Sequence, residues 1–191
     1  MAINLVESVQ KKLKVDELQK IDPDTGKIKD DQLINPSNLF YQLAIPAILT
    51  GFYKYTRLDE GNRDILNMQT GNFISSIFDE HTQGVISKIA DITKTPQDET
   101  RHKMEKIAEA TMITLKENLT GTSSDSHIKD LLTAQRHNIL LYLDPSLQIG
   151  HYINDNTVDD STTKMEGPVS DLVNKIGQIF SGSGNDEKKK I

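Results

Sequence analysis

The sequence predicts an all-α protein, an irregular multi-helix bundle of about six to eight helices. Apolar residues recur three and four positions apart along most of the 191-residue chain, as they do on one face of a helix. Aromatic residues make up 5% of the chain and Trp is absent, so the core must be built from aliphatic side chains, which favours helices over aromatic-rich strands. Pro and Gly separate the apolar stretches into segments of helical length.

The chain opens with an expected amphipathic helix over residues 3–18. Its apolar residues fall mostly on one face, and Lys and Glu side chains occupy the other. The stretch Asp-Pro-Asp-Thr-Gly at residues 22–26 combines turn-forming residues, so we expect a loop that continues to about Gln32.

A second, strongly apolar helix is expected to begin at residues 35–37, Asn-Pro-Ser, which place Pro in the first turn. Residues 39–53 are too few for a bilayer span and include polar side chains, so they predict a core helix. Pro46 removes one backbone donor and predicts a kink near residues 42–46. Gly51 allows another backbone to approach closely.

The middle of the chain predicts a short helix at about residues 61–68 and two longer ones after it. From residue 73 to residue 92 the apolar positions form one long stripe at helical spacing. Thr95 suits an N-cap and Pro96 suits the first helical position, and the acidic residues that follow favour the positive end of a helix. We expect this helix to end at residues 120–121.

The last helix of the bundle is expected to start near Ile128, after capping residues at positions 123–126. Its final turns, residues 139–143, are apolar on all sides, which predicts a central position in the core. The Asp-Pro-Ser stretch at residues 144–146 interrupts it. Residues 147–153 then predict a short packing segment.

The predicted domain organisation has a helical bundle over residues 1–153, a flexible acidic linker over 154–167, an amphipathic terminal helix over 168–182 and a disordered tail over 183–191. The apolar face of the terminal helix supplies the candidate partner-binding residues, which are Val169, Leu172, Val173, Ile176, Ile179 and Phe180. Such a face must be buried against its own domain, a second copy, a protein partner or a membrane surface. A membrane surface is the weakest of these, because the helix has a poor basic face.

Two segments resemble a bacterial protein family. Residues 4–13, NLVESVQKKL, followed after a gap by residues 43–56, LAIPAILTGFYKYT, are similar to the pattern of the YidB-like family of unknown function. That family has an N-terminal helix and then an apolar helix of the form A-x-P-x-x-L-x-G-L. The matching positions are Ala44, Pro46, Leu49, Gly51 and Phe52. The resemblance covers about the first third of the chain, lacks the family's Gly- and Ala-rich texture, and implies a helical fold with no catalytic activity to carry over.

Residues 43–56 also resemble residues 107–120 of the same chain. Ala44 stands opposite Ala108, and Thr50 stands opposite Thr114 at the same offset. One interpretation is a duplicated helical unit, which predicts that the two units pack about a pseudo-two-fold axis. The other is that any two amphipathic helices align this well.

The composition argues against several classes of function. The chain has 22 Lys and Arg against 28 Asp and Glu, a formal net charge of −6, which disfavours a protein that mainly neutralises nucleic-acid phosphates. It has no Cys, which removes disulfides, thiolate metal sites and Cys nucleophiles. Charged residues stand near the start, where a secretory signal would be apolar, so we expect a cytoplasmic location.

Two features have the residue types of a metal or catalytic site. Glu99 and His102 have the E-x-x-H spacing of di-iron carboxylate bundles, but the helix dipole also explains acidic residues in a first turn. His81 falls in line with apolar positions beside two acidic residues. It is either a ligand or general base facing a cavity, or a satisfied histidine at the rim of the core. No cofactor is expected, because the chain lacks a phosphate-binding loop, a nucleophile elbow and a dinucleotide fingerprint.

These observations favour a non-enzymatic interaction or scaffolding module, which requires only a helical core and a docking surface. The alternative is a small helical metalloprotein or enzyme that uses His81 or Glu99 and His102, provided that carboxylates of other helices converge on them. The expected partner is a protein or a second copy of the chain that binds the terminal helix.

Overall fold

The computed structural model describes residues 3–21, 36–57, 65–68, 71–119 and 125–153. Every regular element in these ranges is a helix, which confirms the all-α fold. In chain order the elements are α1 (Leu5–Leu13), α2 (Pro36–Tyr55), the 3₁₀ helix η1 (Ile65–Asn67), α4 (Phe73–Phe78), η2 (Asp79–His81), α5 (Thr82–Thr93), α6 (Gln97–Glu117), α7 (Asp125–Leu140), η3 (Pro145–Leu147) and α8 (Ile149–Tyr152). Within the described ranges, no helix is both long enough and apolar enough to cross a membrane.

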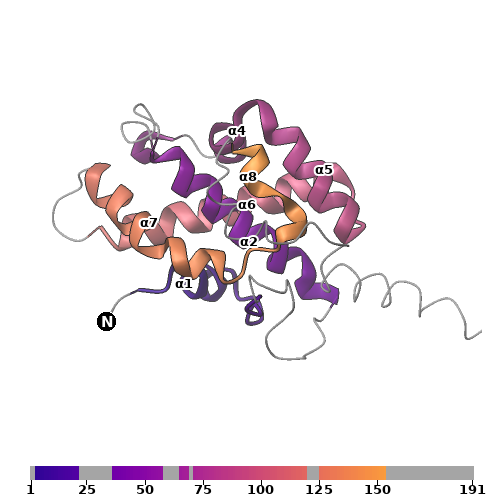
Figure 1. Cartoon of the computed structure of the whole chain (residues 1–191), viewed down its shortest axis with the longest axis horizontal. Coiled ribbons are helices and arrows are strands. Elements are labelled where there is room, and N and C mark those ends of the chain that lie inside the picture. Colours follow the sequence, from indigo (N-terminus) through magenta and orange to yellow (C-terminus); the bar gives the residue numbers. More distant parts are fainter. Residues whose placement is uncertain (1–2, 22–35, 58–64, 69–70, 120–124, 154–191) are drawn as a thin grey trace, which may run out of the picture.

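Helix α2 forms the centre of the bundle. It contacts α1, α4, α5, α6 and α7, and it crosses the middle of the molecule in Figure 1. All residues from 42 to 53 are buried, which fits a helix that is apolar on almost every side. The core helix predicted for residues 39–53 is therefore confirmed. The kink near residues 42–46 and the repeat relating residues 43–56 to 107–120 stay predictions.

Gly51 lies where side chains of α4 pack tightly against α2. A Cβ atom built on Gly51 would lie 3.0 Å from Ile77 Cδ1 and 3.0 Å from Phe78 Cζ, both on α4. The expected close approach of another backbone is not what the structure shows here, because side chains of α4 occupy the space beside Gly51.

Helix α4 takes its N-terminal cap from another helix. Its own N-cap residue, Asn72, makes no side-chain capping bond. The Glu105 carboxylate on α6 instead accepts hydrogen bonds from the backbone N–H groups of Phe73 and Ile74, each at 3.2 Å. These two bonds satisfy N–H groups that have no partner within α4, so Glu105 ties α4 to α6.

The first helix is shorter than predicted. It ends at Leu13, because Lys14 adopts a left-handed conformation with φ 55°. The Val15 N–H then donates to the Gln10 carbonyl, which is the Schellman arrangement that closes a helix. Residues 15–21 continue without helical structure, so the expectation of one helix over residues 3–18 is wrong in its second part.

The apolar stripe from residue 73 to residue 92 is divided between two helices. Asp79 separates them with φ 46° and ψ −127°, and its carbonyl accepts a hydrogen bond from the Thr82 hydroxyl at 2.6 Å. Thr95 does not cap the next helix as predicted, since its hydroxyl pairs with that of Thr93 and Pro96 occupies the N-cap position. The predicted helix at about 61–68 is described only at 65–68, where η1 is a 3₁₀ turn.

Candidate functional site

Residues 15–21, called the strap below, run from the end of α1 along α2 in a non-helical conformation. Buried amide side chains hold the strap by its backbone. The Gln42 side chain accepts the Gln19 N–H at 2.7 Å and donates to the Gln19 carbonyl at 2.9 Å. This paired bond imitates the contact of a neighbouring strand, and Gln42 itself is fully buried.

Further bonds hold both ends of the strap. Gln10 on α1 donates to the Asp16 carbonyl at 3.1 Å, and Asn38 on α2 lies 3.5 Å from the same oxygen. At the far end, the Ile21 N–H donates to the Leu141 carbonyl at 2.7 Å. Leu18 and Ile21 are buried in the core, so the strap is packed as well as hydrogen-bonded.

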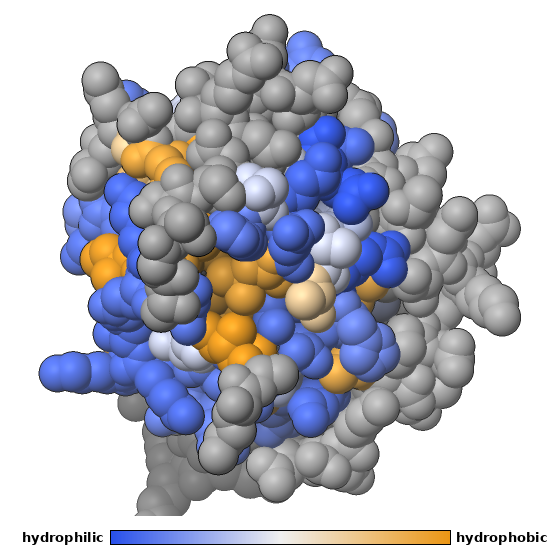
Figure 2. Space-filling model, turned by 90° about the vertical axis from the view of Figure 1, so that its left-hand side faces the viewer, coloured by the Kyte–Doolittle hydropathy of each residue, from blue (hydrophilic) through white to orange (hydrophobic). Residues whose placement is uncertain are grey.

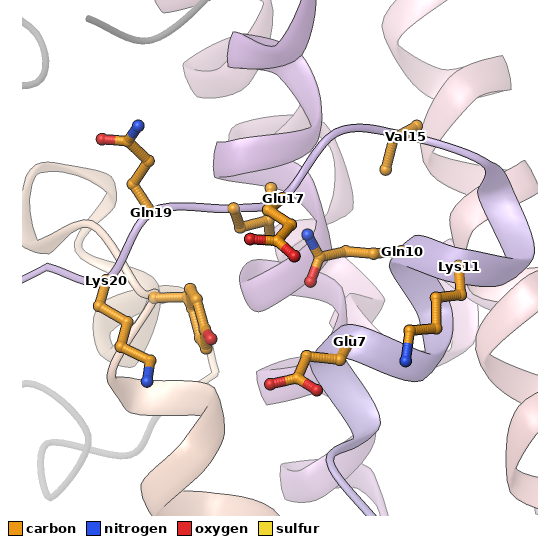
Figure 3. A pocket seen from close by; sticks show the side chains of 9 residues that line it. Glu7, Gln10, Lys11, Val15, Glu17, Gln19 and Lys20 are labelled. Atoms are coloured by element: carbon orange, nitrogen blue, oxygen red, sulfur yellow. The ribbon is translucent and has the colours of Figure 1, made fainter. Parts of the chain in front are cut away.

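A pocket of about 480 Å³ opens between α1, the strap and Tyr142. This volume lies within the range of small-molecule sites in proteins. Its lining is mostly polar and consists of Glu7, Gln10, Lys11, Val15, Glu17, Leu18, Gln19, Lys20 and Tyr142. Figure 3 shows the side chains of Glu7, Gln10 and Glu17 turned toward the same open space, whereas Gln19 points away from it.

The cap of α1 orients the first acidic residue of the pocket. Asn4 is the N-cap, and its side-chain oxygen accepts the Glu7 N–H at 3.4 Å. The Asn4 amide nitrogen also donates to Glu7 Oε1 at 2.8 Å. Glu7 at the third helical position is therefore held from two sides, in a variant of the capping box.

Tyr142 forms the buried wall of the pocket, with only 4% of its surface exposed. Burial raises the pKa of its phenol, and the charges of Glu7 and Glu17 raise it further, while a hydrogen bond with the Asn4 side chain opposes them. The phenol therefore stays protonated near neutral pH and offers a hydroxyl group rather than a phenolate.

Three other charged groups of the pocket have no ion-pair partner among the residues that the structure describes. These are Lys11, Glu17 and Lys20, and all three are exposed. Figure 3 places the two glutamates between the two lysines, with Lys11 on α1 and Lys20 on the strap. The pocket thus contains both acidic and basic side chains, and these described residues form no ion pairs with one another.

Glu99 and His102 do not form a site together. Both are exposed on α6, and Glu99 instead pairs with Lys103 one turn further on, at 2.6 Å. Across the described ranges, no group of three or more His, Cys, Asp or Glu side chains has the arrangement of a metal site. The described part of the chain therefore brings no further carboxylates of the kind that the di-iron interpretation requires to this pair.

His81 lies at the rim of the bundle, with 29% of its side chain exposed. Its Nε2 is 3.5 Å from Glu80 Oε1, and its ring lies 6.4 Å from that of His151 and 6.3 Å from that of Tyr152. This partly exposed position agrees with a histidine at the rim of the core, and a role of His81 as ligand or general base stays a prediction. The sequence did not predict the contact with His151, because 70 residues separate the two.

The candidate partner-binding residues of the terminal helix, from Val169 to Phe180, lie outside the described residues, as do the predicted linker and tail. The sequence does not predict the pocket either. One local signal for it exists, since Asn4-x-x-Glu7 is a helix-start pattern that fixes the orientation of Glu7. No protein-family model, curated protein or solved structure matches this chain.

Proposed function

We propose that this protein is a non-enzymatic interaction module that recognises a polar group in the pocket beside the strap. The observation that carries this proposal is the preformed pocket, whose walls are α1 and a strap held by its backbone. A site that is ordered before binding loses less conformational entropy when the ligand arrives. The paired bond of Gln42 supplies this order, and it leaves the side chains of Glu17 and Lys20 available for recognition.

The chemistry of Tyr142 favours binding over catalysis. A phenol that acts as a general base or nucleophile needs a lowered pKa, whereas burial and two nearby carboxylates raise the pKa of Tyr142. A neutral hydroxyl group is suited to hydrogen bonding with a ligand. The glutamates of the pocket are exposed, which suits ion pairing more than proton transfer.

The distribution of apolar side chains on the surface favours recognition of a ligand through polar groups of the bundle. On the face drawn in Figure 2, apolar residues form separate patches divided by polar side chains. Among the described residues, Ile113 is the one large apolar side chain that is exposed, at 49%. Contiguous apolar patches mark many protein interfaces, so the pocket is the stronger candidate within the bundle.

The experiment is a titration of the ¹⁵N-labelled full chain, followed by NMR, with four small probes. These are acetamide, n-butylamine, propionate and L-glutamine, which present a neutral amide, a cation, an anion and a zwitterion. We expect at least one probe to shift the side-chain amide signal of Gln10 and the backbone signals of Glu17 and Lys20. If no probe shifts these signals at the highest soluble concentration, the proposed function is wrong.

The binding partner expected for residues 168–182 remains a separate proposal, supported by the spacing of their apolar side chains alone. A protein partner or a second copy of the chain would cover that face. A cytoplasmic location also remains a proposal.

A further inference from the structure

We propose that the pocket beside the strap binds a small zwitterion of the α-amino-acid type, with its ammonium group between Glu7 and Glu17 and its carboxylate at Lys20. This inference rests on the proposed function and names the class of ligand. It follows from the position of four charged groups and two neutral polar groups around one cavity.

The acidic side of the pocket is suited to an ammonium group. Glu7 is fixed by Asn4, and both Glu7 and Glu17 act electrostatically on the Tyr142 hydroxyl, so both carboxylates lie near the phenol. An ammonium group has three donors and can bond to both carboxylates and to the phenolic oxygen at once.

The basic groups of the pocket differ in their position. Lys11 lies one helical turn after Glu7, on the α1 wall of the pocket. Lys20 comes from the other wall and lies away from α1 in Figure 3. A carboxylate that enters with the ammonium group therefore meets Lys20 as its counter-charge.

The size of the cavity fits a ligand with both charges. About 480 Å³ holds an amino acid together with several water molecules, at roughly 30 Å³ for each water. Gln10 and Tyr142 add an amide and a hydroxyl group on the buried side. A simple cation would leave Lys20 unpaired, and a simple anion would be repelled by the two glutamates.

The test is calorimetric titration of the full chain with L-glutamine, n-butylamine and propionate, with Glu17→Gln and Lys20→Gln as the pocket variants. Asp91→Asn and Lys106→Gln are controls, because they remove one acidic and one basic charge from exposed positions of α5 and α6 that do not line the pocket. We expect L-glutamine to bind more tightly than either single-charge probe. Each pocket variant should weaken it about tenfold, equivalent to about 1.4 kcal/mol, and the controls should leave it unchanged.

The outcomes separate the two proposals. If acetamide, n-butylamine or propionate perturbs the pocket but L-glutamine binds no more tightly, the zwitterion proposal fails and the interaction module stands. If L-glutamine binds equally well to Glu17→Gln and to the wild type, the position of the ammonium group is wrong. If none of the four probes perturbs the pocket, both proposals fail. Unfolding temperatures within error of the wild type show that the exposed variants fold.

Discussion

Replacing Glu105 by Ala should destabilise the protein through the start of a different helix, α4. The carboxylate on α6 is the acceptor for the backbone N–H groups of Phe73 and Ile74, and Asn72 offers no side-chain cap in its place. Loss of one helix cap costs about 1 kcal/mol, since water replaces part of the lost bond. Two N–H groups lose their acceptor here, so we expect the free energy of unfolding to fall by about 2 kcal/mol.

Urea unfolding followed by far-ultraviolet circular dichroism measures this change. Glu99→Ala is the matched control, because it removes the same charge from the same helix at an exposed pair with Lys103. Such a pair contributes about 0.3–0.5 kcal/mol. If Glu105→Ala costs no more than Glu99→Ala, the interhelical cap does not stabilise the fold.

The pH dependence gives a second test of the same residue. Burial raises the pKa of Glu105 above its ordinary value of 4.5, and the two N–H donors and Arg101 only partly oppose this effect. The folded protein therefore holds this proton more tightly than the unfolded chain does. The tighter binding of this proton adds to the free energy of unfolding. This contribution is complete below pH 4.5 and is lost as the pH rises through the raised pKa.

Glu105→Gln keeps one acceptor oxygen and cannot titrate. The stability advantage of the wild type over this variant should therefore be largest in acid and decrease as the pH rises. An advantage that increases with pH would show that the carboxylate is stabilised in its ionised form and that the stated cause is wrong.

Three further changes test other parts of the fold. Thr100→Val should raise the free energy of unfolding by about 1 kcal/mol, because the Thr100 hydroxyl is buried with no hydrogen-bond partner among the described residues. Thr111→Val is its control, because the Thr111 hydroxyl donates a hydrogen bond to the Ile107 carbonyl at 2.9 Å. If both variants change the free energy of unfolding equally, the unpaired hydroxyl is not the cause. Gly84→Ala should destabilise by about 1–3 kcal/mol, because its Cβ would lie 2.7 Å from Tyr152 Cε1. In a Tyr152→Ala background, Gly84→Ala should instead stabilise α5 by about 1 kcal/mol, because Ala favours a helix over Gly. If thermal unfolding shows that Gly84→Ala destabilises the protein equally in both backgrounds, the clash with Tyr152 is not the cause. Deletion of residues 167–191 should lower the unfolding temperature or change the oligomeric state, and unchanged unfolding and unchanged mass by light scattering would remove the role proposed for that segment.

Apolar spacing was sufficient to predict the fold class and the central helix. Residues 42–53 of α2 are buried because nearly all of them are apolar, and no long-range information is needed to predict this. The end of α1 was not predictable in this way. Lys14 adopts a left-handed conformation without the Gly that usually signals it, and Leu18 continues the apolar pattern although it belongs to the strap.

The pocket depends on contacts between distant parts of the chain. Gln42 and Gln19 are 23 residues apart, and Tyr142 joins Glu7 only when α7 packs beside α1. Polar residues in a helical pattern predict a solvated face, and nothing local distinguishes Gln42 from such a residue. The resemblance of residues 4–13 and 43–56 to the YidB-like family stays a prediction.

The side-chain hydrogen bonds that hold the strap are made to its backbone. The position of the strap therefore depends little on which side chains it carries. Gln10, Asn38 and Gln42 bond to backbone atoms of residues 16, 17 and 19. Any amino acid other than Pro presents those atoms. Exposed strap residues such as Glu17 and Lys20 can therefore be exchanged while the main chain stays in place. Selection, or a protein engineer, can change what the pocket recognises through these two positions at little cost to the stability of the bundle.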